Sequence, residues 1–331
     1  MKSLLKVNEV VELIKSGKKL VLAADEKLLM ALPKGQWIGG TIPYFMSENG
    51  GIETTELIQV GVLPDFVEHC TVIHYRADKL HKIPSDYEQN GVSFIMIPAF
   101  SNAHFEFAKN CSSYQGIFDH PLLGWITGYQ LGQTVLTKPK TFNGLTGEFS
   151  EDGALVMHLN LREDKFGKVN IINIFNQGSG DAISFKETGF EVSSCLVNGV
   201  ETSFFDYIKS NNINTQLPLV ANYSGAAVNV SIMTLNEDKR TVSLYAPVFP
   251  GVDYKIAAAV ESYEGEFEKH VSRMNLTKPT LSCNCVLNYL YANLEGKKTA
   301  NILGPMTFGE IAYMLLNQTM VYVTFEDKVA P

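Results

Sequence analysis

The feature that most constrains the fold is a pair of alternating runs, residues 226–235 and 240–247, which flank a polar turn at residues 236–239. Successive side chains of a strand point to opposite faces, so this alternation is typical of strands with one buried face. Two such runs joined by a short polar turn predict an antiparallel hairpin. Further runs rich in β-branched and aromatic residues predict strands at residues 70–76, 92–98, 153–161 and 168–175.

Apolar residues three or four positions apart predict helices between these strands. The N-terminal segment carries an apolar face made of Leu4, Val7, Val11 and Ile14. Similar stripes run through residues 263–274 and 286–294. Ser101 or Asn102 is expected to cap a short helix that ends near Lys109. Helices interleaved with strands, together with a clear antiparallel hairpin, predict an α+β fold.

The length of the chain favours two packed lobes over a single core. It has 331 residues, of which 45% are hydrophobic and 19% are charged. The turn at residues 176–181 interrupts apolar sequence and marks our predicted boundary. We therefore expect lobes at residues 1–178 and 179–331, each with mixed or antiparallel sheet and flanking helices. The run at 168–175 is apolar on both faces, which predicts a central strand.

Charge and hydropathy exclude several classes of protein. The net charge of −8, which is spread without long acidic runs, argues against nucleic acid as a partner. The longest apolar runs fall far short of the roughly 20 residues of a membrane-spanning helix, so no membrane partner is expected. The N-terminus lacks the apolar core of a signal peptide, which predicts a cytoplasmic protein.

The cysteine and histidine patterns predict neither disulfides nor a metal site. Five cysteines are few and odd in number for a chain of this length, which indicates reduced thiols. His69 and His74 differ by an odd number along a predicted strand, so their side chains point to opposite faces. No spacing matches a structural zinc motif, and we expect no cofactor.

The step Cys283, Asn284 and Cys285 lies between a predicted strand and a predicted helix. The free N–H groups and the dipole of a helix N-terminus favour an anion and lower the pKa of a cysteine there. A ligand contact or a reactive thiolate are two hypotheses for this step. The structural alternative is that Asn284 caps the helix and both cysteines pack as small hydrophobes.

Gly309 and Glu310 follow in a Gly-rich turn within otherwise apolar sequence. A carboxylate in such a place must be solvated, paired or bound to a ligand. One hypothesis is that Glu310 holds the amino group of a ligand. The alternative is a buried carboxylate held by nearby backbone amides.

Two further polar segments are candidates for ligand contacts. Gly39, Gly40 and Thr41, with Tyr44 beyond Pro43, form a predicted loop whose amides could face a small anion. The alternative is a tight connection between strands. Asn222, Tyr223 and Ser224 interrupt apolar sequence before a strand, so they are expected at the end of a sheet, either as ligand contacts or as a simple turn.

The C-terminal motifs resemble those of the FIST domain, a two-part sensory module. FIST-like sequences carry a Ser-Cys-Asn step before a helix, then a Gly-Glu-Ile turn and an Asn-x-Thr segment. Here these stand at residues 282–284, 309–311 and 317–319. The chain departs from the family after the Asn, where Cys285 and Val286 replace a usual Gly-Arg pair. The first half is similar more faintly, through the segment at residues 38–45.

This resemblance implies a stand-alone sensor for a small ligand, such as an amino acid or related metabolite, with an output through a protein signalling partner. We expect the ligand between the lobes, with its carboxylate near residues 283–285 and its amine near Glu310. One alternative is a thiolate enzyme that uses Cys283 or Cys285 with His270 or His158 as base. Another is a protein-interaction scaffold with an apolar surface patch.

Overall fold

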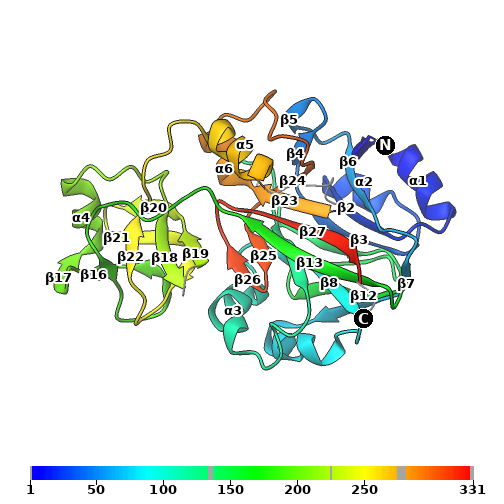
Figure 1. Ribbon diagram of the computed structural model, residues 1–331, viewed down its shortest axis with the longest axis horizontal. Helices are drawn as coiled ribbons and strands as arrows, with labels where there is room; N and C mark the ends of the chain where they lie inside the picture. The colour runs from blue at the N-terminus through cyan, green and yellow to red at the C-terminus, as the bar shows by residue number, and fades with distance from the viewer. Residues whose placement is uncertain (1, 133–136, 224–225, 274–280, 329–331) are drawn as a thin grey trace.

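The computed structural model describes residues 2–132, 137–223, 226–273 and 281–328, which form a larger and a smaller lobe (Figure 1). Segments from both ends of the chain build the larger lobe, whereas the middle of the chain builds the smaller one. Mixed and antiparallel sheets occur with a few helices, so the predicted α+β fold is confirmed. None of the described helices is long and apolar enough to span a membrane.

The larger lobe contains three six-stranded sheets within the described ranges. The first runs from edge to edge through β1 (Leu4–Leu5), β6 (Ile58–Val62), β2 (Leu20–Ala24), β3 (Trp37–Thr41), β10 (Thr141–Asn143) and β11 (Glu148–Ser150). The second runs through β26 (Met314–Leu316), β25 (Glu310–Ala312), β9 (Leu122–Thr127), β8 (Gly91–Pro98), β12 (Ala154–Leu161) and β7 (Val67–Tyr75). The third runs through β13 (Lys165–Ile172), β27 (Met320–Asp327), β23 (Leu281–Cys285), β24 (Gly304–Thr307), β4 (Tyr44–Ser47) and β5 (Gly50–Glu53).

The smaller lobe contains two further sheets. One runs through β17 (Val200–Ser203), β16 (Ser194–Val197), β14 (Ile183–Ser184), β22 (Tyr254–Ile256), β18 (Leu219–Tyr223) and β19 (Ala226–Val230). The other runs through β15 (Gly189–Val192), β21 (Thr241–Val248) and β20 (Ile232–Asn236). The pairing of β20 with β21 confirms the predicted hairpin around the turn, whereas residues 226–230 of its predicted first arm form β19 and pair with β18 instead. Helix α4 (Phe204–Ser210) packs on this lobe (Figure 1).

The other helices belong to the larger lobe. They are α1 (Val7–Lys15), α2 (Glu26–Met30), α3 (Asn102–Asn110), α5 (Tyr263–Arg273) and α6 (Val286–Tyr291), with 3₁₀ turns η1 (Ala77–Asp86) and η2 (Cys111–Ser113). Ser101 caps α3 as predicted, because its side chain accepts a hydrogen bond from the His104 amide (3.1 Å). Helix α1 buries Val10 and Ile14, and Leu4 lies in β1, so the predicted apolar face of this helix was wrong in part.

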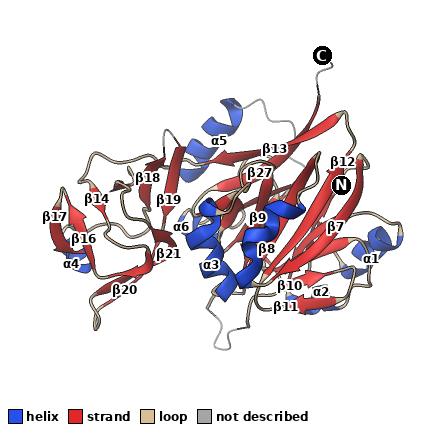
Figure 2. Ribbon diagram, turned by 90° about the horizontal axis from the view of Figure 1, so that it is seen from below, coloured by secondary structure: helices blue, strands red, loops and turns tan. Residues whose placement is uncertain are grey.

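Strand β2 separates two cores. Its side chains alternate: Val21 and Ala23 join the main core, whereas Leu20, Leu22 and Ala24 pack with the helices α1 and α2. Those helices cover the outer side of the first sheet (Figures 1 and 2). The main core fills the space between the first sheet and the sheets that contain β9 and β23, and the same cluster continues into the smaller lobe through residues such as Phe185, Phe204 and Tyr254.

Two predictions about organisation need correction. Strand β13 lies at the edge of its sheet rather than in the centre, because only its pairing with β27 is formed. The chain enters the smaller lobe near the predicted boundary, and Gln177 forms a bridge with Ala257 where it returns. Strands of residues 281–327 then complete sheets of the larger lobe, so the predicted segment 179–331 is divided between both lobes.

Candidate functional site

The two glycines of the first predicted loop lie inside strand β3, so the loop prediction was wrong. A Cβ on Gly39 would lie 3.0 Å from the Leu29 side chain, and a Cβ on Gly40 would lie 2.6 Å from the methyl group of Thr127. Strand β3 therefore packs closely against helix α2 on one face and against the second sheet on the other. Close packing of the layers explains why glycines stand at positions 39 and 40, and an anion-binding loop does not.

Thr41 and Tyr44 are held by backbone groups. The Thr41 hydroxyl donates to the Gly128 carbonyl (2.8 Å) and accepts from the Lys140 amide (2.9 Å). The Tyr44 hydroxyl accepts from the Leu131 amide (2.9 Å). Thr41 also lines a surface pocket, but this pocket is separate from the C-terminal motifs.

Asn222 and Tyr223 end β18 in the smaller lobe, as expected for a sheet end. Ser224 lies outside the described residues. Strand β18 belongs to a sheet of the smaller lobe, whereas β23 and β25 belong to two sheets of the larger lobe.

Cys283, Asn284 and Cys285 are buried at the end of β23, and α6 begins directly after them as predicted. Cys285, not Asn284, is the N-cap residue, and its side chain makes no capping hydrogen bond. The Asn284 side-chain oxygen accepts from the Cys285 amide (2.7 Å) and from the Asn288 side chain (2.9 Å). The Cys283 thiol donates to the Gly124 carbonyl (3.3 Å). Local protein groups therefore satisfy this step without a ligand.

Glu310 lies beside this step but is sealed in the core, with 0% of its surface exposed. One oxygen accepts from the Thr307 hydroxyl (3.1 Å), and the other accepts from the hydroxyl (2.9 Å) and the amide (3.2 Å) of Thr319. The Cys285 thiol is a further partner. The sequence correctly placed Gly309, Glu310 and residues 283–285 in one region, but packed side chains fill it. Glu310 has no free side that could receive a ligand amine.

Burial dominates the ionisation of this cluster. It raises the pKa of Glu310 to about 8, although the hydrogen bonds from Thr307 and Thr319 act in the opposite direction. Burial and the nearby Glu310 also raise the pKa of Cys285 and Cys283 well above the ordinary value of a thiol. Near neutral pH the cluster therefore favours a protonated carboxyl and two neutral thiols, which does not suit a thiolate nucleophile.

The two histidines considered as bases have other partners. His158 is buried, and its ring nitrogens contact the hydroxyls of Tyr75 (2.9 Å) and Ser93 (2.8 Å). Desolvation lowers the pKa of His158 to about 4. His270 contacts the backbone carbonyl of Glu266 (2.9 Å). Within the described ranges, no cluster of three or more potential metal ligands occurs.

A pocket of about 340 Å³ lies where the two lobes meet. The smaller lobe and the segments that join it to the larger one contribute Phe175, Asn214, Gln216, Leu217, Val260, Glu261 and Ser262, and the larger lobe contributes Tyr263, Glu264, Asn288, Tyr291, Ala292, Lys297 and Gln318. Its volume is within the range of metabolite sites. Asn288 and Tyr263 connect it to the sealed cluster, since both side chains hydrogen-bond to Asn284.

Charges of both signs line this inter-lobe pocket. Lys297 forms an ion pair with Glu264 (2.8 Å), and Glu261 is a second acidic residue of the lining. Both partners of the ion pair keep part of their side chains exposed, so they can exchange partners at low cost. These charged residues give no signal in the sequence, because single charges before and after helices are typical of any solvated surface.

Buried polar side chains connect the lobes beside this pocket. The Asn229 side chain of β19 donates to the Asn173 side chain (3.0 Å) and to the Asn317 carbonyl (3.1 Å). The Ser231 hydroxyl donates to the side-chain oxygen of Gln318 (2.8 Å), whose amino group donates to the Gln216 carbonyl (3.1 Å). The Asn-x-Thr motif at residues 317–319 thus contacts the smaller lobe on one side and Glu310 on the other.

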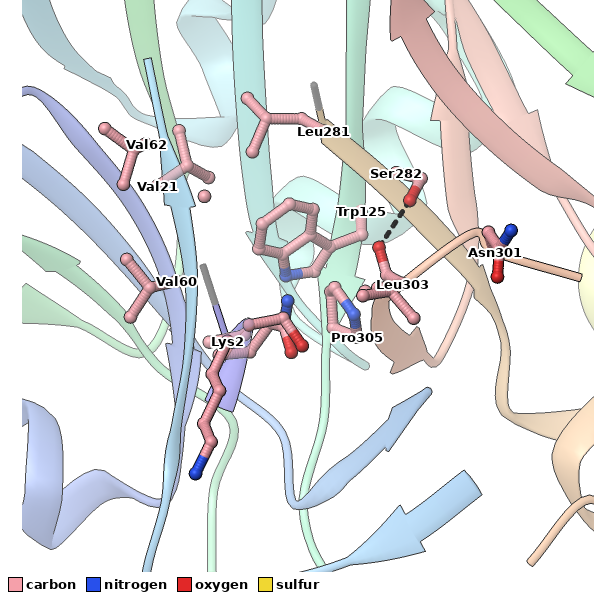
Figure 3. A pocket seen from close by; sticks show the side chains of 15 residues that line it. Lys2, Val21, Val60, Val62, Trp125, Leu281, Ser282, Asn301, Leu303 and Pro305 are labelled. Carbon is pink, nitrogen blue, oxygen red and sulfur yellow. Dashed lines mark hydrogen bonds between the residues drawn. The ribbon is translucent and has the colours of Figure 1, made fainter. Parts of the chain in front are cut away.

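A second pocket, of about 160 Å³, lies between the first and third sheets (Figure 3). Strands β2 and β6 form one wall, β23 and β24 form the other, and Trp125 of β9 closes the end. Ser282 of the C-terminal motif faces it and donates to the Leu303 carbonyl (2.6 Å).

Comparison with known proteins gives a family but no activity. A family model described as a family of unknown function, DUF6976, matches residues 5–326. The chain belongs to this family. No curated protein matches it. The matched range runs through both lobes of this DUF6976 member. It contains all residues that line the inter-lobe pocket, and all that line the pocket of Figure 3 except Lys2 and Ser3. The resemblance to FIST domains stays a prediction from the C-terminal motifs.

Proposed function

We propose that this DUF6976 protein is a cytoplasmic sensor that binds an amino acid or related metabolite in the inter-lobe pocket. The observation that carries the proposal is that both lobes line one pocket that contains Lys297, Glu261 and Glu264 between aromatic and aliphatic side chains. A ligand with an amino and a carboxylate group would be complementary to these charges.

The charged residues of this pocket take the roles that the sequence suggested for the C-terminal motifs. Lys297 would pair with the ligand carboxylate, and Glu261 with its amine. Glu264 would give up part of its contact with Lys297. This ion pair is partly exposed, so it contributes little to the free energy of unfolding. Glu310 and Asn284 would act behind the pocket, by holding Asn288 and Thr319 in place.

A ligand that contacts both lobes would also favour one relative arrangement of them. Where two lobes have more than one relative arrangement, a ligand shifts the equilibrium toward the arrangement that it binds better. A protein partner that recognises this arrangement would provide the output.

Thermal-shift measurements against amino acids and related metabolites test the proposal. A ligand present at about 100 times its Kd stabilises the folded state by about 2.7 kcal/mol, which is readily detected. Replacing Lys297 by methionine should weaken binding of such a ligand about tenfold or more, because a charge-assisted hydrogen bond is lost.

The matched control is Lys186→Met, which removes a lysine of the smaller lobe that pairs with Glu201 (2.9 Å) away from the pocket. Binding should be unchanged in this variant. Equal weakening in both variants, or no stabilisation by any ligand that carries amino and carboxylate groups, would reject the inter-lobe pocket as an amino-acid site.

A further inference from the structure

The pocket of Figure 3 contains two buried polar atoms whose hydrogen-bonding capacity is unused. The indole N–H of Trp125 and the side-chain oxygen of Gln59 both lack a hydrogen-bond partner among the described residues. Trp125 is 4% exposed and Gln59 is 7% exposed, so bulk water does not satisfy them. Unpaired buried polar groups destabilise a folded protein, so a small molecule that pairs with both atoms would be favoured in this space.

The backbone holds both residues firmly. Gln59 lies in β6 between Leu4 of β1 and Ala23 of β2. Trp125 lies in β9 between Met96 of β8 and Glu310 of β25. Each is therefore bonded through its backbone on two sides, which holds in place the strands from which the two side chains reach the pocket.

Glycines let the side chains around the pocket approach the strands of the first sheet closely. A Cβ on Gly40 would lie 3.1 Å from the Trp125 nitrogen, and a Cβ on Gly61 would lie 1.8 Å from a methyl carbon of Leu281. The absence of side chains at these positions lets the indole and Leu281 approach β3 and β6. A cavity of about 160 Å³ remains, which corresponds to about five water molecules.

The remaining lining is mostly uncharged. Among the fifteen residues that line the pocket, Lys2 is the single ionisable one, and its ammonium group points away from Trp125 (Figure 3). Lys2 and Asn301 are exposed, so the pocket has a route to solvent on their side. Apolar walls, one donor and one acceptor fit a small neutral molecule and disfavour a charged one.

We propose that this pocket is a second binding site, specific for a small neutral carboxamide. The amide carbonyl would accept from the Trp125 indole, and the amide N–H would donate to the Gln59 oxygen. One amide group provides both an acceptor for the indole N–H and a donor for the Gln59 oxygen. A ketone provides only the acceptor, and an alkane provides neither. This site is independent of the inter-lobe pocket and of the charged ligand proposed there.

The test uses the full-length ¹⁵N-labelled protein and 2-pyrrolidinone, a cyclic amide, as the probe. The chain has two tryptophans, so its two indole N–H signals can be assigned with a Trp37→Phe variant. Titration should shift the Trp125 signal in a saturable way. The Trp37 signal is an internal control, because its indole already donates to the Pro33 carbonyl (2.9 Å) and should not move.

Cyclopentanone is the matched probe, since it has a similar ring and carbonyl but no N–H. It should bind the wild-type protein about tenfold more weakly than 2-pyrrolidinone, because one neutral hydrogen bond is missing. In Gln59→Leu the two probes should bind equally well. The comparison of probes on the wild-type protein needs no variant, so it stands even if Gln59→Leu fails to fold.

Three outcomes would overturn the inference. Absence of a saturable shift of the Trp125 signal with either probe would mean that the cavity holds water alone. Equal affinity of both probes for the wild-type protein would remove the role of Gln59 as acceptor. An equal shift of both indole signals would indicate a general solvent effect rather than a site.

Discussion

At the scale of single residues, Glu310 shows how burial competes with hydrogen bonding. Four protein donors from Thr307, Thr319 and Cys285 surround its carboxyl group, and each favours the ionised form. Complete desolvation outweighs them and raises its pKa to about 8. A protonated Glu310 can donate to the Thr307 hydroxyl, which then donates to the carbonyl of Asn284 or Gly309. The same geometry therefore serves both protonation states.

Glu310 should make the protein less stable as pH rises. Its pKa is about 8 in the folded state and about 4.3 in an unfolded chain, so between these values the unfolded state has released a proton that the folded state keeps. The stabilising contribution is complete below about pH 4 and is lost as pH rises toward 8. The free energy of unfolding should fall by up to about 1.4 kcal/mol per pH unit from this group.

The variant Glu310→Gln keeps the shape and cannot ionise. Its stability relative to the wild-type protein should increase by a few kcal/mol between pH 5 and pH 8. Denaturant unfolding at four or five pH values measures this difference. The exposed Glu163→Gln serves as control and should follow the wild-type curve. Parallel curves for Glu310→Gln and the wild type would mean that Glu310 is ionised in the folded state.

At the scale of elements, the distance between layers decides which residues a strand can carry. Gly39 and Gly40 suggested a loop, because glycine is common in turns. In the structure they allow β3 to pass between α2 and the second sheet. The side chain that excludes a Cβ at Gly39 is Leu29 of the preceding helix, whereas the one at Gly40 is Thr127 of a strand far along the chain, which leaves no local signal.

Replacing Gly40 by alanine tests this explanation. The new methyl group would lie 2.6 Å from the Thr127 methyl group and must displace it within a packed interior. Overpacking of this kind typically costs about 1–3 kcal/mol of stability. Chemical denaturation measures it. Gly180→Ala is the matched control, because nothing lies within 4 Å of the new atom and its φ is outside the left-handed region; a similar loss in both variants would contradict the packing argument.

At the scale of the whole molecule, the lobes are connected by amide side chains rather than by an apolar interface alone. Asn229 of the smaller lobe contacts Asn173 near the crossing point and Asn317 of the larger lobe. All polar atoms in such a buried network need partners, so the loss of one member affects the others.

The variant Asn229→Ala should therefore destabilise the junction by about 1–3 kcal/mol, because Asn173 and Asn317 lose a buried partner. Both tryptophans lie in the larger lobe, so their fluorescence follows that lobe, while circular dichroism follows both. The two thermal transitions should separate in this variant. The exposed Asn211→Ala should leave them unchanged. Coincident transitions in Asn229→Ala would show that other contacts couple the lobes.

The sequence alone determined the local elements and the fold class. Alternation within residues 226–247 predicted a hairpin, and Ser101 predicted the start of α3. Each of these two signals is local, because the residues that make it lie close together along the chain. The C-terminal motifs correctly predicted a strand followed by a helix at residues 281–291, and Glu310 near that junction.

Only the tertiary structure decided what surrounds those residues. Whether Glu310 faces a ligand or a packed core depends on Thr307, Thr319 and the density of the layers, none of which the local pattern records. The same holds for both pockets, which are assembled from strands or lobes far apart along the chain. Residue chemistry and spacing are local properties, whereas burial and cavity shape arise from long-range packing.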